Sequence, residues 1–101
     1  MTSQGIEVFL SYLRETEQRY HMAEADEQEA NNETQDILHS LELQDHDYHD
    51  FARLSKELRG VRQKRRAAKD TMSEAAPVLD WIDQNRTTIK NLERLLGDVR
   101  K

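Results

Sequence analysis

The stretch that decides the fold is Phe9–Leu41, FLSYLRETEQRYHMAEADEQEANNETQDILHSL, which contains neither Gly nor Pro. Seam positions, mostly apolar but weak in the middle, recur in it at alternating steps of three and four residues, at Phe9, Leu13, Thr16, Tyr20, Ala23, Glu27, Ala30, Thr34, Ile37 and Leu41. This spacing is typical of the buried seam of a helix that packs lengthwise on another helix. It predicts a helix over about 3–43, about 60 Å long at 1.5 Å per residue. Such a rod needs a partner along its whole length.

A second helix is expected over about 47–84, with Asp47 as its N-cap. Its broad apolar face comprises Tyr48, Phe51, Leu54, Leu58, Val61, Arg62, Arg65, Ala68, Met72, Ala75, Ala76, Leu79 and Ile82. Pro77 predicts a kink or a break, since proline lacks an N–H and clashes with the preceding turn, and Ser73 could cap the restart. A third helix is expected over about 88–100, capped by Thr87 or Thr88, with Ile89, Leu92, Leu96 and Val99 as its stripe.

The polar connection at 44–47 is short, and short connections favour antiparallel neighbours. Folding the chain there pairs positions whose numbers add up to about 89–90, so that Phe9 faces Leu79 and Ile6 faces Ile82. The sequence therefore predicts one all-α domain over residues 1–101. Its architecture is a long antiparallel, coiled-coil-like hairpin with a shorter C-terminal third helix.

The formal charge of −5 hides a strong asymmetry between the two halves. Residues 1–50 carry thirteen acids and two bases, and residues 51–101 carry seven acids and thirteen bases. The hairpin register lays the acidic stretch 15–36 beside the basic stretch 53–69, with Glu27 opposite Arg62 and with Glu24 near Arg65 and Arg66. We therefore expect an intramolecular zipper of ion pairs that selects the register more than it stabilises it.

The middle of the seam is the most unusual local feature, because polar side chains occupy core-type positions there. Thr16, Glu27 and Thr34 do so in the first helix, and Arg62 and Arg65 in the second. One interpretation is a buried ionic layer that specifies register at a cost in desolvation. The other is an opening in which Tyr20, Arg62, Arg65 and Lys69 hold an anionic group.

The charged stretches allow two further interpretations. Arg59, Arg62, Arg66 and Lys69, here called the basic ridge, are spaced three, four and three residues apart and could follow nucleic-acid phosphates. The acidic pI of about 5.3 and the lack of interleaved aromatic residues count against this. The acidic stretch could instead imitate phosphates toward a nucleic-acid-binding protein, through Glu15, Glu17, Glu24, Asp26, Glu27, Glu29, Glu33 and Asp36.

Signals for catalysis, cofactors and membrane insertion are missing from the sequence. There is no Cys, no Gly-rich phosphate loop and no nucleophile with an evident His base. The His and Asp residues at 45–50 match no strong metal-ligand spacing, and no apolar run approaches the length of a membrane span. We expect a cytoplasmic protein without enzymatic activity, cofactor, metal or membrane association. Trp81 could pack the third helix against the hairpin or anchor a partner.

The stretch from Tyr48 to Lys69, with Leu54, Leu58, the basic ridge and Arg65, followed by Pro77 and an apolar helix, resembles small helical proteins of phages and prophages of Gram-positive bacteria. The resemblance implies an accessory protein in the host cytoplasm that acts on a host or phage protein, such as an inhibitor of a defence or replication protein. Self-association into a dimer or higher oligomer is expected as well. The alternatives are a nucleic-acid-binding accessory protein, not favoured, and a helical oligomer that sequesters an anionic nucleotide signal. The candidate interaction or ligand residues are Tyr20, Glu24, Glu27, Arg59, Arg62, Arg65, Arg66, Lys69 and Trp81.

Overall fold

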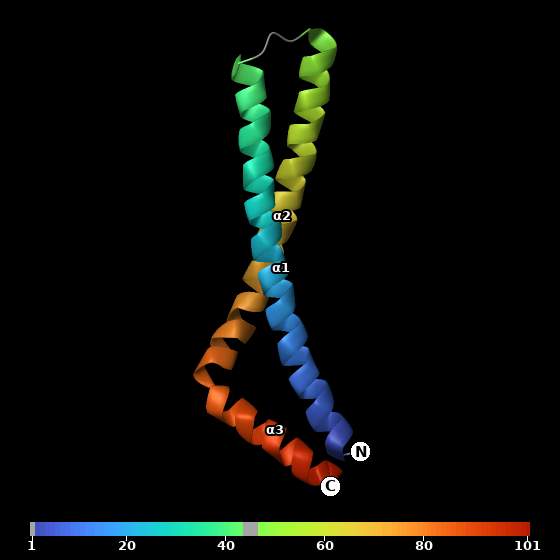
Figure 1. Ribbon diagram of the computed structural model, residues 1–101, viewed down its shortest axis with the longest axis vertical. Helices are drawn as coiled ribbons and strands as arrows, with labels where there is room; N and C mark the ends of the chain where they lie inside the picture. The colour runs from blue at the N-terminus through green and yellow to red at the C-terminus, as the bar shows by residue number, and fades with distance from the viewer. Residues whose placement is uncertain (1, 44–46) are drawn as a thin grey trace.

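The computed structural model describes residues 2–43 and 47–101 and consists of three helices (Figure 1). α1 spans Thr2–Leu43, α2 spans Tyr48–Gln84 and α3 spans Arg86–Arg100. Within the described ranges there is no strand. The predicted all-α hairpin with a shorter third helix is confirmed.

The molecule is a rod of 69 × 24 × 18 Å. α1 and α2 run side by side in one half, cross near the middle and then diverge (Figure 1). α3 closes the opening between them by running back toward the start of α1, so that the two termini lie near each other (Figure 1). Two ion pairs join α3 to α1, one at each end of α3: Arg86–Glu17 at 3.4 Å and Arg100–Glu7 at 2.8 Å.

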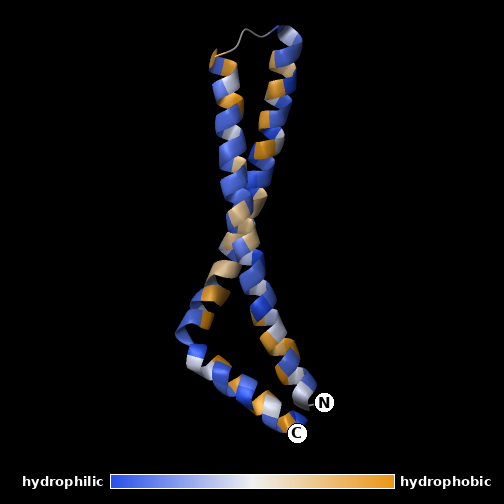
Figure 2. Ribbon diagram, viewed as in Figure 1, coloured by the Kyte–Doolittle hydropathy of each residue, from blue (hydrophilic) through white to orange (hydrophobic). Residues whose placement is uncertain are grey.

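The core is thin and follows the predicted period. Its buried side chains recur along α1 and α2 at steps of three residues or multiples of seven, and small or weakly apolar residues gather where the helices cross (Figure 2). They are Leu10, Leu13, Thr16, Ala23, Ala30 and Ile37 of α1 and Leu54, Ala68, Ala75 and Ile82 of α2. In α1, Phe9 was wrongly predicted as a seam position, since Leu10 is only 3% exposed whereas Phe9 is 39% exposed. In α2, Tyr48 and Phe51 of the predicted apolar face are exposed.

The register agrees with the hairpin prediction. The rings of Phe9 and Trp81, whose numbers add up to 90, meet edge to face with their centroids 6.0 Å apart. Phe9 was expected to face Leu79, and the ring that it contacts is instead that of Trp81, two residues further along α2. Closer to the middle of the rod, Thr16 and Ala75, whose numbers add up to 91, line one cavity, which agrees with the same register.

The helix ends follow local backbone chemistry. Asp47 caps α2 as predicted, because its carboxylate accepts a hydrogen bond from the Asp50 N–H at 2.9 Å. α2 continues through Pro77, so the restart capped by Ser73 does not form. α3 begins at Arg86, directly after Asn85, so a cap at Thr87 or Thr88 is wrong as well. The exposed position of Pro77 lets water solvate the carbonyl that its missing N–H leaves free.

None of the helices, over the ranges that the structure describes, is long and apolar enough to cross a membrane.

Replacing Leu10 should show which of the adjacent apolar residues belongs to the core. Leu10→Ala should lower the free energy of unfolding by about 2–4 kcal/mol, because it removes a buried side chain that the thin core cannot refill. Val8→Ala, at a side chain that is 69% exposed, should cost less than about 0.5 kcal/mol. Urea unfolding followed by circular dichroism measures both. Equal losses for the two variants would contradict the observed core.

Candidate interaction surfaces

Arg65 is the polar side chain that enters the seam of α2. Its spacing from Leu58, Val61 and Ala68 continues the heptad, and it is half-buried, as is Glu27 in α1. Its Nε is buried and has no hydrogen-bond partner. Within the described residues Arg65 also forms no ion pair with Glu27. The seam therefore contains a polar layer, but the expected bonded pair is absent from it.

The other polar core positions divide into two kinds. Thr16 and Thr34 satisfy their hydroxyls locally, since each Oγ1 donates to the carbonyl four residues earlier, at 2.8 Å. Arg62, by contrast, is exposed, so its placement in the seam was wrong. The heptad uses Val61 at this level, and the next residue points away from α1.

The predicted zipper is mostly wrong. Of the eight bases in 53–69, only Lys64 reaches an acid of α1 in the described structure, with its Nζ 3.1 Å from Glu29 and 3.8 Å from Glu33. The hydrogen bond to Lys64 and its charge lower the pKa of Glu29, and the hydrogen bond to Glu29 raises the pKa of Lys64. Among the described residues, Arg53 pairs only with Asp50 and Glu57 of its own helix.

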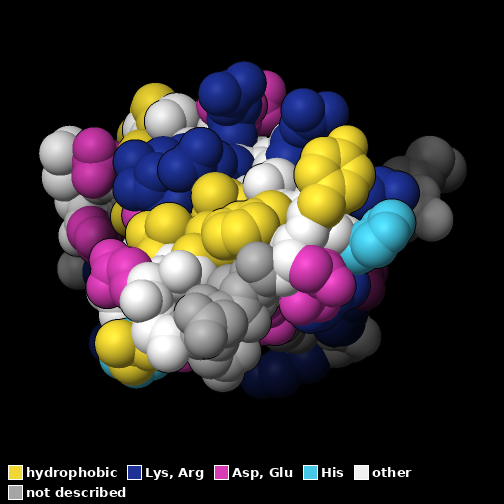
Figure 3. Space-filling view, turned by 90° about the horizontal axis from the view of Figure 1, so that it is seen from above, with side chains coloured by type: hydrophobic (Ala, Val, Ile, Leu, Met, Phe, Trp, Pro, Cys, Tyr) yellow, Lys and Arg dark blue, Asp and Glu magenta, His cyan; other side chains and the backbone are white. Residues whose placement is uncertain are grey.

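The basic ridge is accordingly exposed and unneutralised. All four of its side chains face solvent, and within the described ranges none of them forms an ion pair. A shallow groove along α2 is lined by Arg59, Arg62 and Arg66 together with Ser55, Leu58 and Gln63. Figure 3, which looks along the rod from the loop end, shows Lys and Arg side chains gathered along one side of an apolar band.

The acids of α1 lie on the other flank of the seam. Asp26 comes directly before the core-type position Glu27, and Glu33 directly before Thr34. Lys64 comes directly before Arg65 in the same way. Residues that follow core positions point to the opposite flank, because successive side chains on a helix are separated by about 100°. Glu24 lies on that opposite flank, where its carboxylate is 2.9 Å from His21 Nδ1. The structure therefore separates most of the acids from the basic ridge.

An aromatic patch is the main apolar surface of the diverging half. Phe9, Tyr12, Val78 and Trp81 form it together with Leu13 and Pro77, and the groove between them is almost entirely apolar. Tyr12 is 49% exposed and Trp81 is 39% exposed. Trp81 thus packs on α1 through Phe9. Ile82 lies with Leu10 and Leu13 of α1 and Ile89 of α3 in a separate groove.

The candidate residues for an anionic group differ in their exposure. Tyr20 and Arg65 are half-buried along the seam, and the Tyr20 ring meets that of His21 at 5.8 Å. Arg62 and Lys69 are exposed. In the described part of the chain no three His, Asp or Glu side chains are placed to hold a metal. Asp45 and His46 of the 45–50 run lie outside the described residues.

Sequence reasoning missed two surface residues that matter. Lys64 was counted within the basic run, although its place just before Arg65 puts it on the acidic flank. Tyr12 was left out of the candidate set, although it precedes the core position Leu13 in the same way. In both cases the informative signal was the position of the residue in the heptad. That position is known only when the seam residues are assigned without a one-residue error.

Arg65 provides a test of the polar layer. Arg65→Met should raise the free energy of unfolding by about 1 kcal/mol, since it removes a half-buried charge with an unsatisfied Nε while keeping the apolar stem. Arg66→Met, on the exposed ridge, should change it by less than about 0.5 kcal/mol. Thermal unfolding compares the two. A loss of stability in Arg65→Met alone would mean that the guanidinium makes an attractive contact within the seam.

Comparison of the chain with models of known protein families, with curated proteins and with solved structures found no match.

Proposed function

We propose that this protein is a helical interaction module, similar in kind to small phage accessory proteins, that binds another protein through its aromatic patch. The observation that carries the proposal is the exposure of Phe9, Tyr12 and Trp81 side by side on a two-helix scaffold. Aromatic side chains are enriched in the centres of protein interfaces, because they bury large areas at a small entropic cost. Their position on packed helices keeps them in place before a partner arrives.

The surroundings of the patch indicate the chemistry of the partner. Glu15 lines the adjoining groove with Val8, Tyr12 and Glu7, which also pairs with Arg100. Glu74 of α2 lies beside the patch, in a cavity that Arg19 also lines. A complementary surface would offer an apolar side chain surrounded by Lys and Arg. Proteins that act on nucleic acids carry such basic surfaces. An inhibitor of a host replication or defence protein is the role that fits this chemistry best.

A second candidate function, nucleic-acid binding, is favoured by a separate observation. The basic ridge keeps four bases free of ion pairs within the described structure, at a spacing that can follow phosphates. If this function is correct, the protein should slow the migration of DNA or RNA in a gel at low salt, and added salt should weaken this binding. Arg62→Ala/Arg66→Ala should abolish it. It does not involve the aromatic patch.

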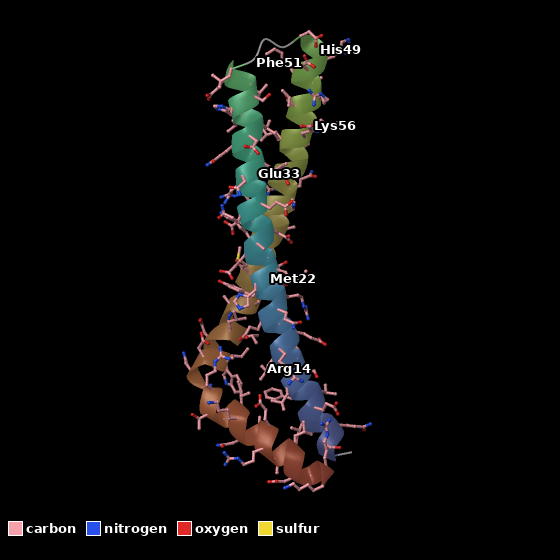
Figure 4. All side chains as sticks on the ribbon, in the orientation of Figure 1. Arg14, Met22, Glu33, His49, Phe51 and Lys56 are labelled. Atoms are coloured by element: carbon pink, nitrogen blue, oxygen red, sulfur yellow. The ribbon has the colours of Figure 1, made fainter. Side chains whose placement is uncertain are left out.

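The aromatic patch can be tested by retention of a partner from a lysate of a Gram-positive host. The immobilised wild type should retain one or a few proteins, identified by mass spectrometry. Val8→Ser/Tyr12→Ser, which alters Tyr12 of the patch and Val8 of the adjoining groove, should reduce their retention at least tenfold, on the order expected when hot-spot contacts are removed. Both side chains are exposed, so the double variant should keep its helicity. Met22→Ser, at an exposed apolar residue near the crossing (Figure 4), is the matched control.

Undiminished retention by Val8→Ser/Tyr12→Ser would place the partner elsewhere on the rod. If the wild type retained no protein from hosts in which the gene is active, the proposed role as an interaction module would be wrong.

A further inference from the structure

We propose that the rods associate side by side, with an acidic flank of one copy covering the basic ridge of a second copy. The acidic flank consists of Asp26, Glu29, Glu33 and Asp36 on α1. This inference concerns a surface different from the aromatic patch, so it stands whether or not the proposed partner binding is correct.

The first argument is the match in spacing. The acids of the flank follow one another at steps of three, four and three residues, as the bases of the ridge do. Each row therefore extends over about 15 Å of helix, at 1.5 Å per residue. A row of four carboxylates laid along the ridge brings each of them opposite a base.

The second argument is that, within the described residues, the ridge forms no ion pair and the acidic flank has one paired base for its four acids. On the acidic flank, Lys64 is the only base that pairs with α1 in the described ranges, and it serves Glu29 and Glu33 together. Asp26 and Asp36 form no ion pair there, and Glu33 lies on α1 where the two helices run side by side (Figure 4). On the opposite flank, the α1 residues that follow core positions beside the ridge are Glu24, Gln28, Asn31 and Gln35, whose only acid contacts His21.

The third argument is that the two rows lie on opposite flanks at similar heights. Lys64 and Arg66 occupy the two sides of Arg65, about 200° apart around α2. The hairpin register places the middle of the acidic flank, near residue 31, opposite residue 60 of α2, a few residues from the middle of the ridge. A copy displaced sideways, in the same orientation, therefore meets the ridge with its acidic flank.

The exposed area supports an assembly of this kind. The chain has 7737 Å² of accessible surface, whereas a compact monomer of 11.9 kDa has about 6,000 Å². A standard interface covers about 800 Å² of each partner, so contacts on both flanks would bury about the excess. Because the two contacting surfaces differ, the contact is heterologous, and copies in the same orientation repeat as an open row of rods.

Charge reversal tests the proposal. In dilute salt the wild type should sediment as an oligomer, and Arg62→Glu/Arg66→Glu and Asp26→Lys/Asp36→Lys should each sediment as 11.9 kDa monomers. An equimolar mixture of the two variants should recover the oligomer, because each reversed surface then meets its complement. High salt should dissociate both assemblies. Lys90→Glu/Arg94→Glu, which reverses the same number of charges on α3, should remain oligomeric.

Several outcomes would overturn the proposal. One is a wild type that stays monomeric at millimolar concentration in dilute salt. Another is an oligomer that persists in both reversed variants, which would place the contact on the aromatic patch. A third is a pair of reversed variants, each helical by circular dichroism, whose mixture stays monomeric. A wild-type monomer that binds DNA or RNA through Arg62 and Arg66 would assign the ridge to nucleic acid.

Discussion

The lengthwise contact between α1 and α2 is the constraint on which the rest of the structure depends. Neither helix could persist alone as a rod of this length, since helices in water owe most of their stability to a packed apolar face. The seam that joins them decides which side chains are buried and, one residue to either side, which flank each charge occupies. The positions of the aromatic patch, the acidic flank and the basic ridge all follow from which residues of each helix face the seam.

The seam contains few large apolar side chains. Several of its buried positions are Ala, and the layer around Arg65 and Glu27 is polar. A side chain such as Ala contributes little burial energy, which leaves the larger residues near the ends, including Leu10, Leu13 and Ile82, to carry more of the stability. α3 adds to the same end through Ile89 and its ion pairs with α1. The polar middle is thus bracketed by more strongly packed segments.

The fold could be predicted because its signals are local and repetitive. The period of α1, the capping carboxylate of Asp47 and the short polar connection each point to a helical hairpin, and they agree with one another. The continuity of α2 through Pro77 could not be predicted in the same way, because it depends on the exposed position of that residue. The start of α3 at Arg86 follows a single-residue break at Asn85, whereas Thr87 or Thr88 was expected to cap the helix after a longer break.

The candidate surfaces were predicted less well, because they depend on the phase of the seam to within one residue. Admitting Arg62 beside Val61 had little effect on the fold but placed a residue of the basic ridge in the seam. A count of charges by segment carries no information about flank, so the acidic and basic stretches were expected to neutralise each other. In the structure only Lys64 joins them, and the net charge of −5 conceals two opposed surfaces.

The separation of the acidic flank from the basic ridge is tested most directly by cross-linking of engineered thiols, since the chain contains no Cys of its own. Glu33→Cys/Lys64→Cys places two thiols on one flank of the hairpin, and Glu33→Cys/Arg62→Cys places them on opposite flanks. At protein concentrations low enough to keep the chain monomeric, a short bis-maleimide should join the first pair rapidly within one chain and leave the second pair open. Equally fast intramolecular cross-linking of both pairs would contradict the separation of the acidic flank from the basic ridge.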